Sequence, residues 1–451
     1  MLPATCATPE TLAALRGETA PLYAEMLTPP ARLGPTGRSS TAPPPAGRTW
    51  YGSPYDDHLE TEHFTLNWWT SGVTEDDARR AGDALETAWT ALVEEQGWVP
   101  PVSADQYFLW VLLDPRLGST TGYTTEYFTD DYPDGYPVIY LNPSGASDAP
   151  FWSALSTHEF MHTLQYAVRD WSGSNPTESW YWEASATWAP EIADPDVDGH
   201  QYCSAWYASQ PELRYDATDG SHHYGLFVFN AWLDELGVGP GAMLDVWTLS
   251  ARRTDTPWDA ILAESTGITI ADLWAGFTGA YGNNELAESD LYLDAVREGV
   301  LTDGVGGSLP YLGSHYWRSP VAAEVRVEGD VILSAAGAVG ASVAVHAGET
   351  LAVTGTIDGA SYVLHMDTPN EDTGGDEPDT GIPPGDDTGP PDGDDTAGET
   401  GHPDDAPSAR DDKGDEAPAG CGCVAAGPAP TPWFAAVFGV LAALRRRAVR
   451  R

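Results

Sequence analysis

Residues 151–168 read FWSALSTHEFMHTLQYAV, and they predict a strong helix. The apolar residues of this segment are available to pack a core. His158 and His162 are four residues apart, and side chains at this spacing lie on one face of a helix. Two imidazoles on one face can bind a single metal ion, and Glu159 stands beside the first of them.

The pattern His-Glu-x-x-His predicts a zinc site with a general base. Neutral imidazole nitrogens suit zinc at about 2.0–2.1 Å. Zinc lowers the pKa of its bound water toward about 7, and the side chain of Glu159 points beside the metal, where a base for that water must stand. The alternative is a pair of histidines on a polar helix face that bind no metal.

A catalytic zinc site needs a third protein ligand, and the segment WYWEASATW at residues 180–188 offers Glu183. This is the one charged residue in an aromatic and small-residue stretch. Because an unpaired buried carboxylate is costly, we expect a cation beside it. Glu178 is a competitor, but it falls near the expected helix N-terminus, where the helix dipole favours a carboxylate. Glu191 follows a proline, and we expect it past the useful part of the helix.

His-Glu-x-x-His followed by a glutamate on the next helix resembles the gluzincin group of zinc metallopeptidases over residues 51–286. The resemblance implies a zincin-like fold, peptide-bond hydrolysis, the ligands His158, His162 and Glu183, and the base Glu159. Around Glu183, Trp-Glu-Ala-Ser-Ala-Thr-Trp replaces the Asn-Glu-x-x-Ser-Asp of the thermolysin pattern. The sequence is closer to secreted bacterial zincins, so substrate preference is not transferred. The third histidine of metzincins is absent after His162.

Residues 222–224, His-His-Tyr, open a later predicted helix and offer a donor for the developing oxyanion. Gluzincins often use a downstream Tyr or His in this way. The resemblance therefore gives this role to Tyr224 and His223 together, without separating them. The alternative is a helix N-terminus with ordinary polar residues.

The order of patterns predicts an α+β fold, with a mixed sheet followed by a helical lobe. Thr74 is a candidate N-cap for the first helix, because acidic residues follow it. The expected strands are residues 63–69, 107–113 and 137–141. The expected helices are residues 74–96, 151–168, 179–192, 224–236, 242–251, 257–264 and 270–281.

Composition divides the chain into five parts. Residues 1–50 are an N-terminal segment with a Pro-rich linker, and residues 51–300 form the metallopeptidase domain. Short Val-rich runs separated by glycine predict a small all-β domain at residues 301–366. Residues 367–420 are mostly Asp, Gly, Pro and Thr, and they predict a disordered acidic linker.

Residues 421–451 form a distinctive tail. Cys421 and Cys423 precede an apolar run at residues 433–444, which is short for a bilayer span, and arginines follow it. This order resembles the MYXO-CTERM sorting signal of myxobacteria and their relatives. The resemblance implies surface display with processing near the two cysteines, and the alternative is a plain membrane anchor. Residues 1–16 show no secretory signal. Because the tail argues for export, we treat the missing signal as a gap in the sequence rather than as evidence of a cytoplasmic protein.

The net charge of −47 excludes nucleic acid as a partner, because such a field repels phosphates. We expect a monomer that meets a membrane only through its tail before processing.

Cys6 and Cys203 form a disulfide or stay as two buried thiols. Residues 194–199, DPDVDG, resemble the start of a Ca²⁺ loop, but Ala205 replaces its closing glutamate, which favours a simple acidic turn.

These observations predict a zinc-dependent endopeptidase that is displayed on, or released from, the bacterial cell surface. Its substrate would be a protein or peptide, and His-Glu-x-x-His chemistry does not exclude an amide bond in cell-wall peptide. The alternative is a surface-displayed binding or adhesive protein with a structural or vestigial zinc site.

Overall fold

The computed structural model describes residues 55–368, apart from residues 102–103, 106–107, 116, 118–120, 128–135, 146–147, 169–178, 219–220, 239, 254–255 and 287–298. Residues 1–54 (which include Cys6), Glu178 and residues 369–451 all lie outside the described residues. The predictions for them therefore stay predictions.

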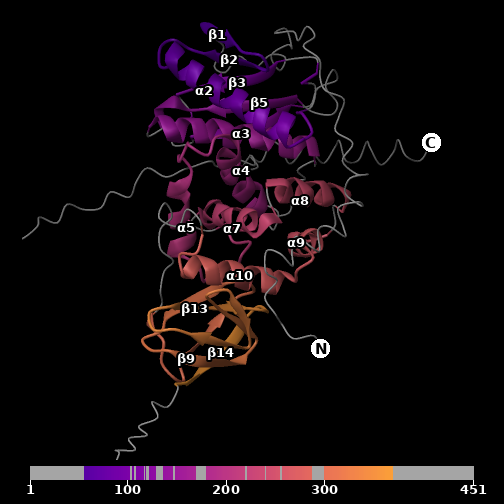
Figure 1. The fold of residues 1–451 in the computed structure, drawn as a ribbon. Helices are drawn as coiled ribbons and strands as arrows, with labels where there is room; N and C mark the ends of the chain where they lie inside the picture. Colours follow the sequence, from indigo (N-terminus) through magenta and orange to yellow (C-terminus); the bar gives the residue numbers. More distant parts are fainter. Residues whose placement is uncertain are drawn as a thin grey trace, which may run out of the picture. The chain divides into compact units, whose positions relative to one another are not determined.

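A five-stranded mixed sheet opens the described chain (Figure 1). Its strands follow the order β1-β2-β3-β5-β4, and the central pairs β2–β3 and β3–β5 are parallel, while β4 pairs antiparallel with β5 at one edge. The sequence patterns missed β1 and β4, which lack a long apolar run. The bounds are β1 Asp57–Glu60, β2 Phe64–Trp68, β3 Leu109–Leu113, β4 Gly122–Tyr127 and β5 Tyr136–Leu141.

Two helices pack against this sheet and against each other. The first, α2 (Glu75–Ala88), begins with a capping box, because Thr74 accepts from the Asp77 backbone N–H and Asp77 accepts in return. The expected single helix over residues 74–96 instead changes to a π-helix at Trp89–Glu95. The second, α3 (Ala149–Val168), follows the 3₁₀ turn Pro143–Gly145 and is buried along most of its length.

A helical lobe follows, and its first helix, α4 (Ser179–Ala193), packs along α3. The lobe is held by contacts between aromatic rings, such as those of Trp180 with Trp274 and of Phe229 with Phe277. The remaining elements are the 3₁₀ turn Gln201–Cys203, α5 Ser204–Ser209, α6 His222–Gly225, α7 Phe227–Leu233, the π-helix Asp234–Val238, α8 Pro240–Arg252, α9 Trp258–Thr266 and α10 Ile270–Gly282.

Two mostly antiparallel sheets end the described chain, in the orders β11-β10-β13-β8-β6 and β12-β9-β14-β7. The Val-rich runs of the sequence did not predict β6, β7, β8 or β11. The bounds are β6 Gly299–Val300, β7 Gly306–Leu309, β8 Ser314–Arg318, β9 Ala323–Gly329, β10 Val331–Ala335, β11 Ala338–Gly340, β12 Ser342–Val345, β13 Thr350–Gly355 and β14 Ala360–Asp367.

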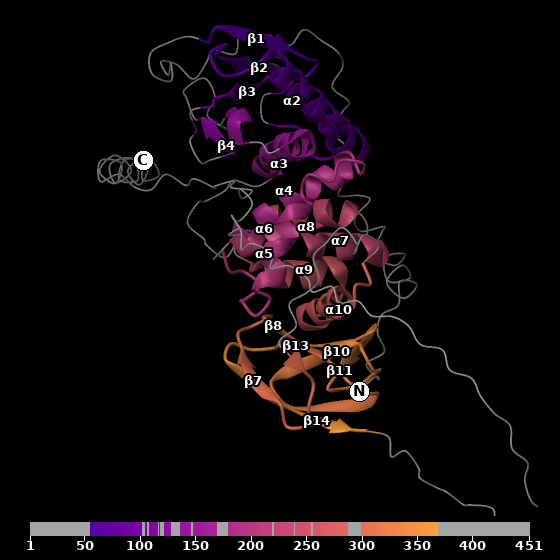
Figure 2. The same ribbon diagram turned by 90° about the vertical axis from the view of Figure 1, so that its left-hand side faces the viewer.

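The first of these sheets shares a core with the helical lobe through α10 (Figure 2). Tyr316 of β8 is fully buried, and its hydroxyl lies 2.9 Å from the hydroxyl of Tyr207 in α5. The hydroxyls of Thr278 in α10 and Thr354 in β13 are 3.1 Å apart. The strands therefore brace the helical lobe.

The architecture confirms the mixed α+β class in its broad sense. The helices predicted around residues 151–168, 179–192 and 270–281 are present almost within their expected bounds. No helix of the described part of the chain is both long and apolar enough to cross a membrane.

Candidate metal centre

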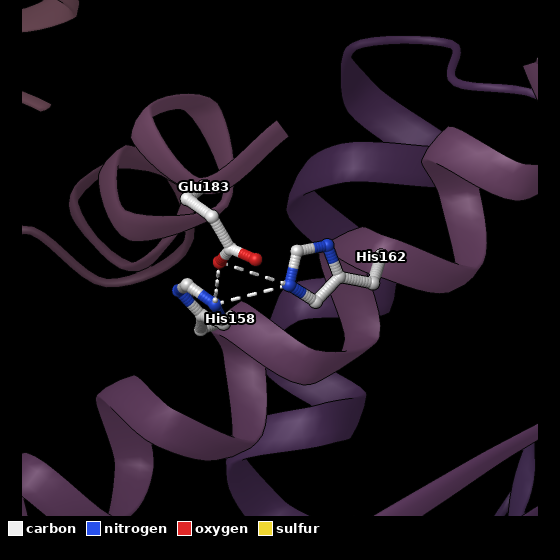
Figure 3. Close-up of side chains that lie close together, drawn as sticks. All are labelled: His158, His162 and Glu183. Carbon is white, nitrogen blue, oxygen red and sulfur yellow. Dashed lines mark hydrogen bonds and ion pairs between the residues drawn. The ribbon is translucent and has the colours of Figure 1, made fainter. Parts of the chain in front are cut away.

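Three buried side chains from α3 and α4 point at one another in the core (Figure 3). The Nε2 atoms of His158 and His162 are 3.1 Å apart. The Oε2 atom of Glu183 lies 3.2 Å from Nε2 of His158 and 3.5 Å from Nε2 of His162. Within the described residues, this is the group of three or more His, Cys, Asp or Glu side chains that can hold a metal ion.

The local sequence explains how the three side chains meet. His158 and His162 lie one helical turn apart on α3. On α4, Ala184 and Ala186 are fully buried next to Glu183, and such small side chains let two helices approach closely. The three residues that the sequence proposed as ligands are therefore brought together by the packing of two consecutive helices.

The histidines and Glu183 shift one another's pKa values, because opposite charges lie close together in a buried site. Burial by itself lowers the pKa of His162, but the nearby Glu183 carboxylate outweighs burial and raises that pKa to about 9. The two histidines hold the pKa of Glu183 well below its usual range, although burial alone raises it. A carboxylate at 2 % exposure needs a cation beside it, and a divalent metal meets this need as an imidazolium does.

Gln165 fixes which nitrogen of His162 faces the group. Its Nε2 donates to the carbonyl of Trp182 and to the hydroxyl of Ser185, each at 3.0 Å. Its Oε1 must then face Nδ1 of His162, 2.7 Å away, and an amide oxygen can only accept. The Nδ1 atom therefore carries a proton, and Nε2 is the nitrogen that faces Glu183 and becomes available to a metal ion once the ring is neutral.

Further hydrogen bonds lock this arrangement between α3, α4 and α8. The Ser185 hydroxyl donates to the carbonyl of Tyr181 and accepts from Nε1 of Trp247 at 3.1 Å. The sequence analysis did not single out Gln165 or Ser185. The spacing of Gln165, three residues after His162 on the same helical face, was the available signal.

Glu159 is fully buried beside the group and is held by the edge strand β4. The Thr124 hydroxyl lies 2.9 Å from its Oε2 and 2.7 Å from its backbone carbonyl. A Cβ at Gly122 would come within 2.9 Å of Oε1, so glycine leaves the space that this carboxylate occupies. Among the described residues, Oε1 has no hydrogen-bond partner.

Burial raises the pKa of Glu159 above its usual value, and His162 and His158 oppose this rise. A carboxyl whose pKa moves toward neutrality is better matched to taking up and releasing a proton. The position and environment of Glu159 therefore suit proton transfer next to the three-residue group.

Tyr224 and His223 lie on the short helix α6, near the same group. The ring centroid of Tyr224 is 6.1 Å from that of His158 and 4.3 Å from that of His223. Burial lowers the pKa of His223, and the Glu183 carboxylate opposes this, so His223 lies within the field of the group. The structure does not separate the two as oxyanion donors.

The other residues that the sequence singled out lie outside the three-residue group. Helix α4 continues through Pro190 to Ala193 and includes Glu191, whose Oε2 lies 3.8 Å from Nε2 of His200 and which is not part of the metal-binding group within the described residues. Residues 194–198 form a turn in which Val197 donates to the carbonyl of Asp194. The carboxylates of this turn are not part of the metal-binding group within the described residues, and calcium binding stays a prediction. Cys203 is buried, and its pairing with Cys6 stays untested.

No protein-family model matches the chain, and neither the curated proteins nor the solved structures searched contain a match.

Proposed function

We propose that the chain is a zinc-dependent endopeptidase of the gluzincin type, with His158, His162 and Glu183 as zinc ligands and Glu159 as general base. The observation that carries the proposal is the buried triangle of three donor atoms with a second carboxylate beside it.

The dimensions of the triangle support zinc. Tetrahedral zinc with metal–ligand distances of about 2.0–2.2 Å separates its ligand atoms by roughly 3.3–3.5 Å. The three measured separations are 3.1, 3.2 and 3.5 Å. Two histidines and one glutamate also leave the fourth position open, as a catalytic site requires.

When bound, zinc supplies Lewis acidity, which polarises a carbonyl group and lowers the pKa of water. Glu159 accepts the proton of the attacking water through Oε1, which has no hydrogen-bond partner among the described residues, and passes it to the leaving amine. Thr124 holds the other carboxylate oxygen in place, so the base keeps its position during the transfer. Tyr224 or His223 donates to the oxygen on which negative charge develops.

The order of elements supports a zincin-like arrangement. A mixed sheet with an antiparallel edge strand precedes α3, and the third ligand follows on the next helix. The C-terminal tail leads us to place the enzyme outside the cytoplasm or on the cell surface. We propose that it acts there as a monomer on a protein or peptide.

A surface binding or adhesive protein with a structural zinc site is the competing function. A structural site has no use for a fully buried base, and it usually closes with a fourth protein ligand. Glu159 therefore favours the enzyme.

The decisive experiment compares wild type with Glu159→Gln in zinc content and casein cleavage. We expect about one zinc per chain in both proteins, and a loss of cleavage of roughly 10²–10⁴-fold in the variant, which is the usual contribution of a general base. Glu60→Gln, at an exposed position of β1, is the matched control and should cleave like wild type. Equal cleavage by Glu159→Gln, or wild-type protein without zinc, overturns the proposal.

A further inference from the structure

A small pocket lies directly against the metal centre. Its cavity measures about 30 Å³, and its lining comes from α3, α4, α6 and the segment that follows α4. On α3 the lining residues are Phe151, Ala154, Leu155 and His158, which share one helical face. The pocket therefore extends along α3 from the first member of the metal-binding group.

The pocket and the metal centre share residues. His158 lines the pocket while its Nε2 lies 3.2 Å from Glu183. Tyr224, one of the two candidate oxyanion donors, also lines it. A group held in this pocket is consequently next to the position where the peptide bond would react.

The lining contains few groups that could pair with a charged side chain. It contains no Asp, Glu, Lys or Arg, and burial lowers the pKa of its second histidine, His200, to about 4, so that this ring is neutral at pH 7. The nearest carboxylate to His200 is on Glu191, 3.8 Å away, and it is not part of the lining. A charged side chain would lose its hydration here without gaining a partner.

The pocket is also narrow. A water-sized group needs about 10–15 Å³ of such a cavity, so about 30 Å³ accommodates two or three groups of this size. The backbone of Gly199 forms one wall of the pocket. An added Cβ at this position would lie 2.3 Å from the carbonyl oxygen of Pro150. That wall cannot retreat without moving the start of α3.

We propose that this pocket selects a small neutral aliphatic side chain, from alanine to valine in size, on the substrate residue next to the cleaved bond. The proposal rests on the peptidase function above. It names the substrate class that the enzyme would take, namely peptides with such a residue beside the scissile bond, and it excludes acidic, basic and indole side chains at that position.

The first experiment digests a peptide library with zinc-loaded wild type and maps the cleavage sites by mass spectrometry. We expect one position adjacent to the cut to be occupied by Ala or Val. Replacing that residue by Asp, Lys or Trp in a single peptide should lower kcat/KM at least about tenfold. Cleavage that ignores this position overturns the pocket proposal, whereas no cleavage of any peptide overturns the peptidase function itself.

The second experiment changes the width of the pocket. Phe151→Leu shortens a lining side chain and should raise the ratio of kcat/KM for Phe over Val at the selected position about tenfold. Ala154→Val adds two methyl groups to the same wall and should shift the preference from Val toward Ala by a similar factor. Gain of a new preference cannot result from partial unfolding.

Phe64→Leu is the matched control, because it makes the same change at a fully buried position of β2 outside the lining. It should leave the ratio as in wild type. Equal ratios in wild type, Phe151→Leu and Ala154→Val, or an equal change in Phe64→Leu, overturn the assignment of the pocket.

Discussion

The pair of helices α3 and α4 and the two C-terminal sheets both have tightly buried interiors, yet they bury different kinds of side chain. The helix pair places His158, Glu159, His162 and Glu183 inside the protein. The described strands β6 to β14 bury no acidic or basic side chain. The core cluster between them consists of aliphatic residues and Tyr362, and the polar groups that they bury are hydroxyls, such as those of Tyr316 and Thr354. Their ion pairs, such as Arg326 with Asp367, lie at the surface.

Burying charge costs stability unless the charges are paired, whereas burying aliphatic groups stabilises. In the proposed enzyme the helix pair would therefore carry the chemistry, and the sheets support it through the shared core at Tyr316 and α10. Each of the following predictions tests this division between a region for chemistry and a region for stability.

The largest effect is expected from Glu183→Gln, which removes the charge that faces both histidines. Zinc affinity should fall more than about a hundredfold, beyond the usual effect of an outer-shell change, and peptide cleavage should fall with it. The comparison is Glu328→Gln on β9, whose side chain is 81 % exposed and which should bind zinc like wild type. Competition with a coloured chelator measures both, and equal affinities would contradict the assigned ligand.

Leu351→Ala tests the C-terminal sheets. Leu351 is fully buried in β13, so its truncation should lower the free energy of unfolding by about 2–5 kcal/mol without changing zinc affinity. Urea denaturation measures the first quantity and chelator competition the second. Val363→Ala, at a position 39 % exposed, is the control and should cost much less. A folded Leu351→Ala protein that no longer binds zinc would show that the division is wrong.

Acid sensitivity should come from the helical region. The pKa of His200 is about 4 in the folded protein because burial disfavours its charged form, whereas an unfolded histidine has a pKa of about 6.5. The unfolded state thus binds more protons between these values, so stability is lost as the pH falls from about 6.5 to 4, by at most about 3 kcal/mol.

His200→Phe should flatten this dependence. Urea titrations of both proteins at a series of pH values, in the presence of a chelator, measure the difference in slope. Parallel curves for wild type and variant would mean that His200 is not held neutral by burial.

A smaller effect is expected at Gln165. Gln165→Leu removes the acceptor from Nδ1 of His162 and should weaken zinc binding about 10–100-fold. Gln165→Glu keeps an acceptor at the same place and should recover much of the affinity, although it loses the donors to Trp182 and Ser185. A glutamate variant as weak as the leucine variant would indicate that Gln165 acts through packing alone.

Local periodic patterns allowed the sequence to predict the elements that dominate the fold. Helix α3 and strand β3 were predicted close to their bounds, because long apolar runs and helical spacing are local signals. Strand β4 was missed, since residues 122–127, GYTTEY, contain neither a long apolar run nor a turn dipeptide at the expected place. Its position is set by pairing with β5, which is a non-local interaction.

The sequence by itself determined the helix that carries His158, Glu159 and His162, and it indicated Glu183, because a lone carboxylate in an aromatic helix needs a cation. Only the tertiary structure decided which side chains hold these residues in place. Thr124 reaches Glu159 from a strand 35 residues away, and the pocket along α3 is closed by Gly199 and Tyr224 from other segments. Helical spacing fixes contacts within four residues, whereas contacts between elements depend on how their surfaces pack.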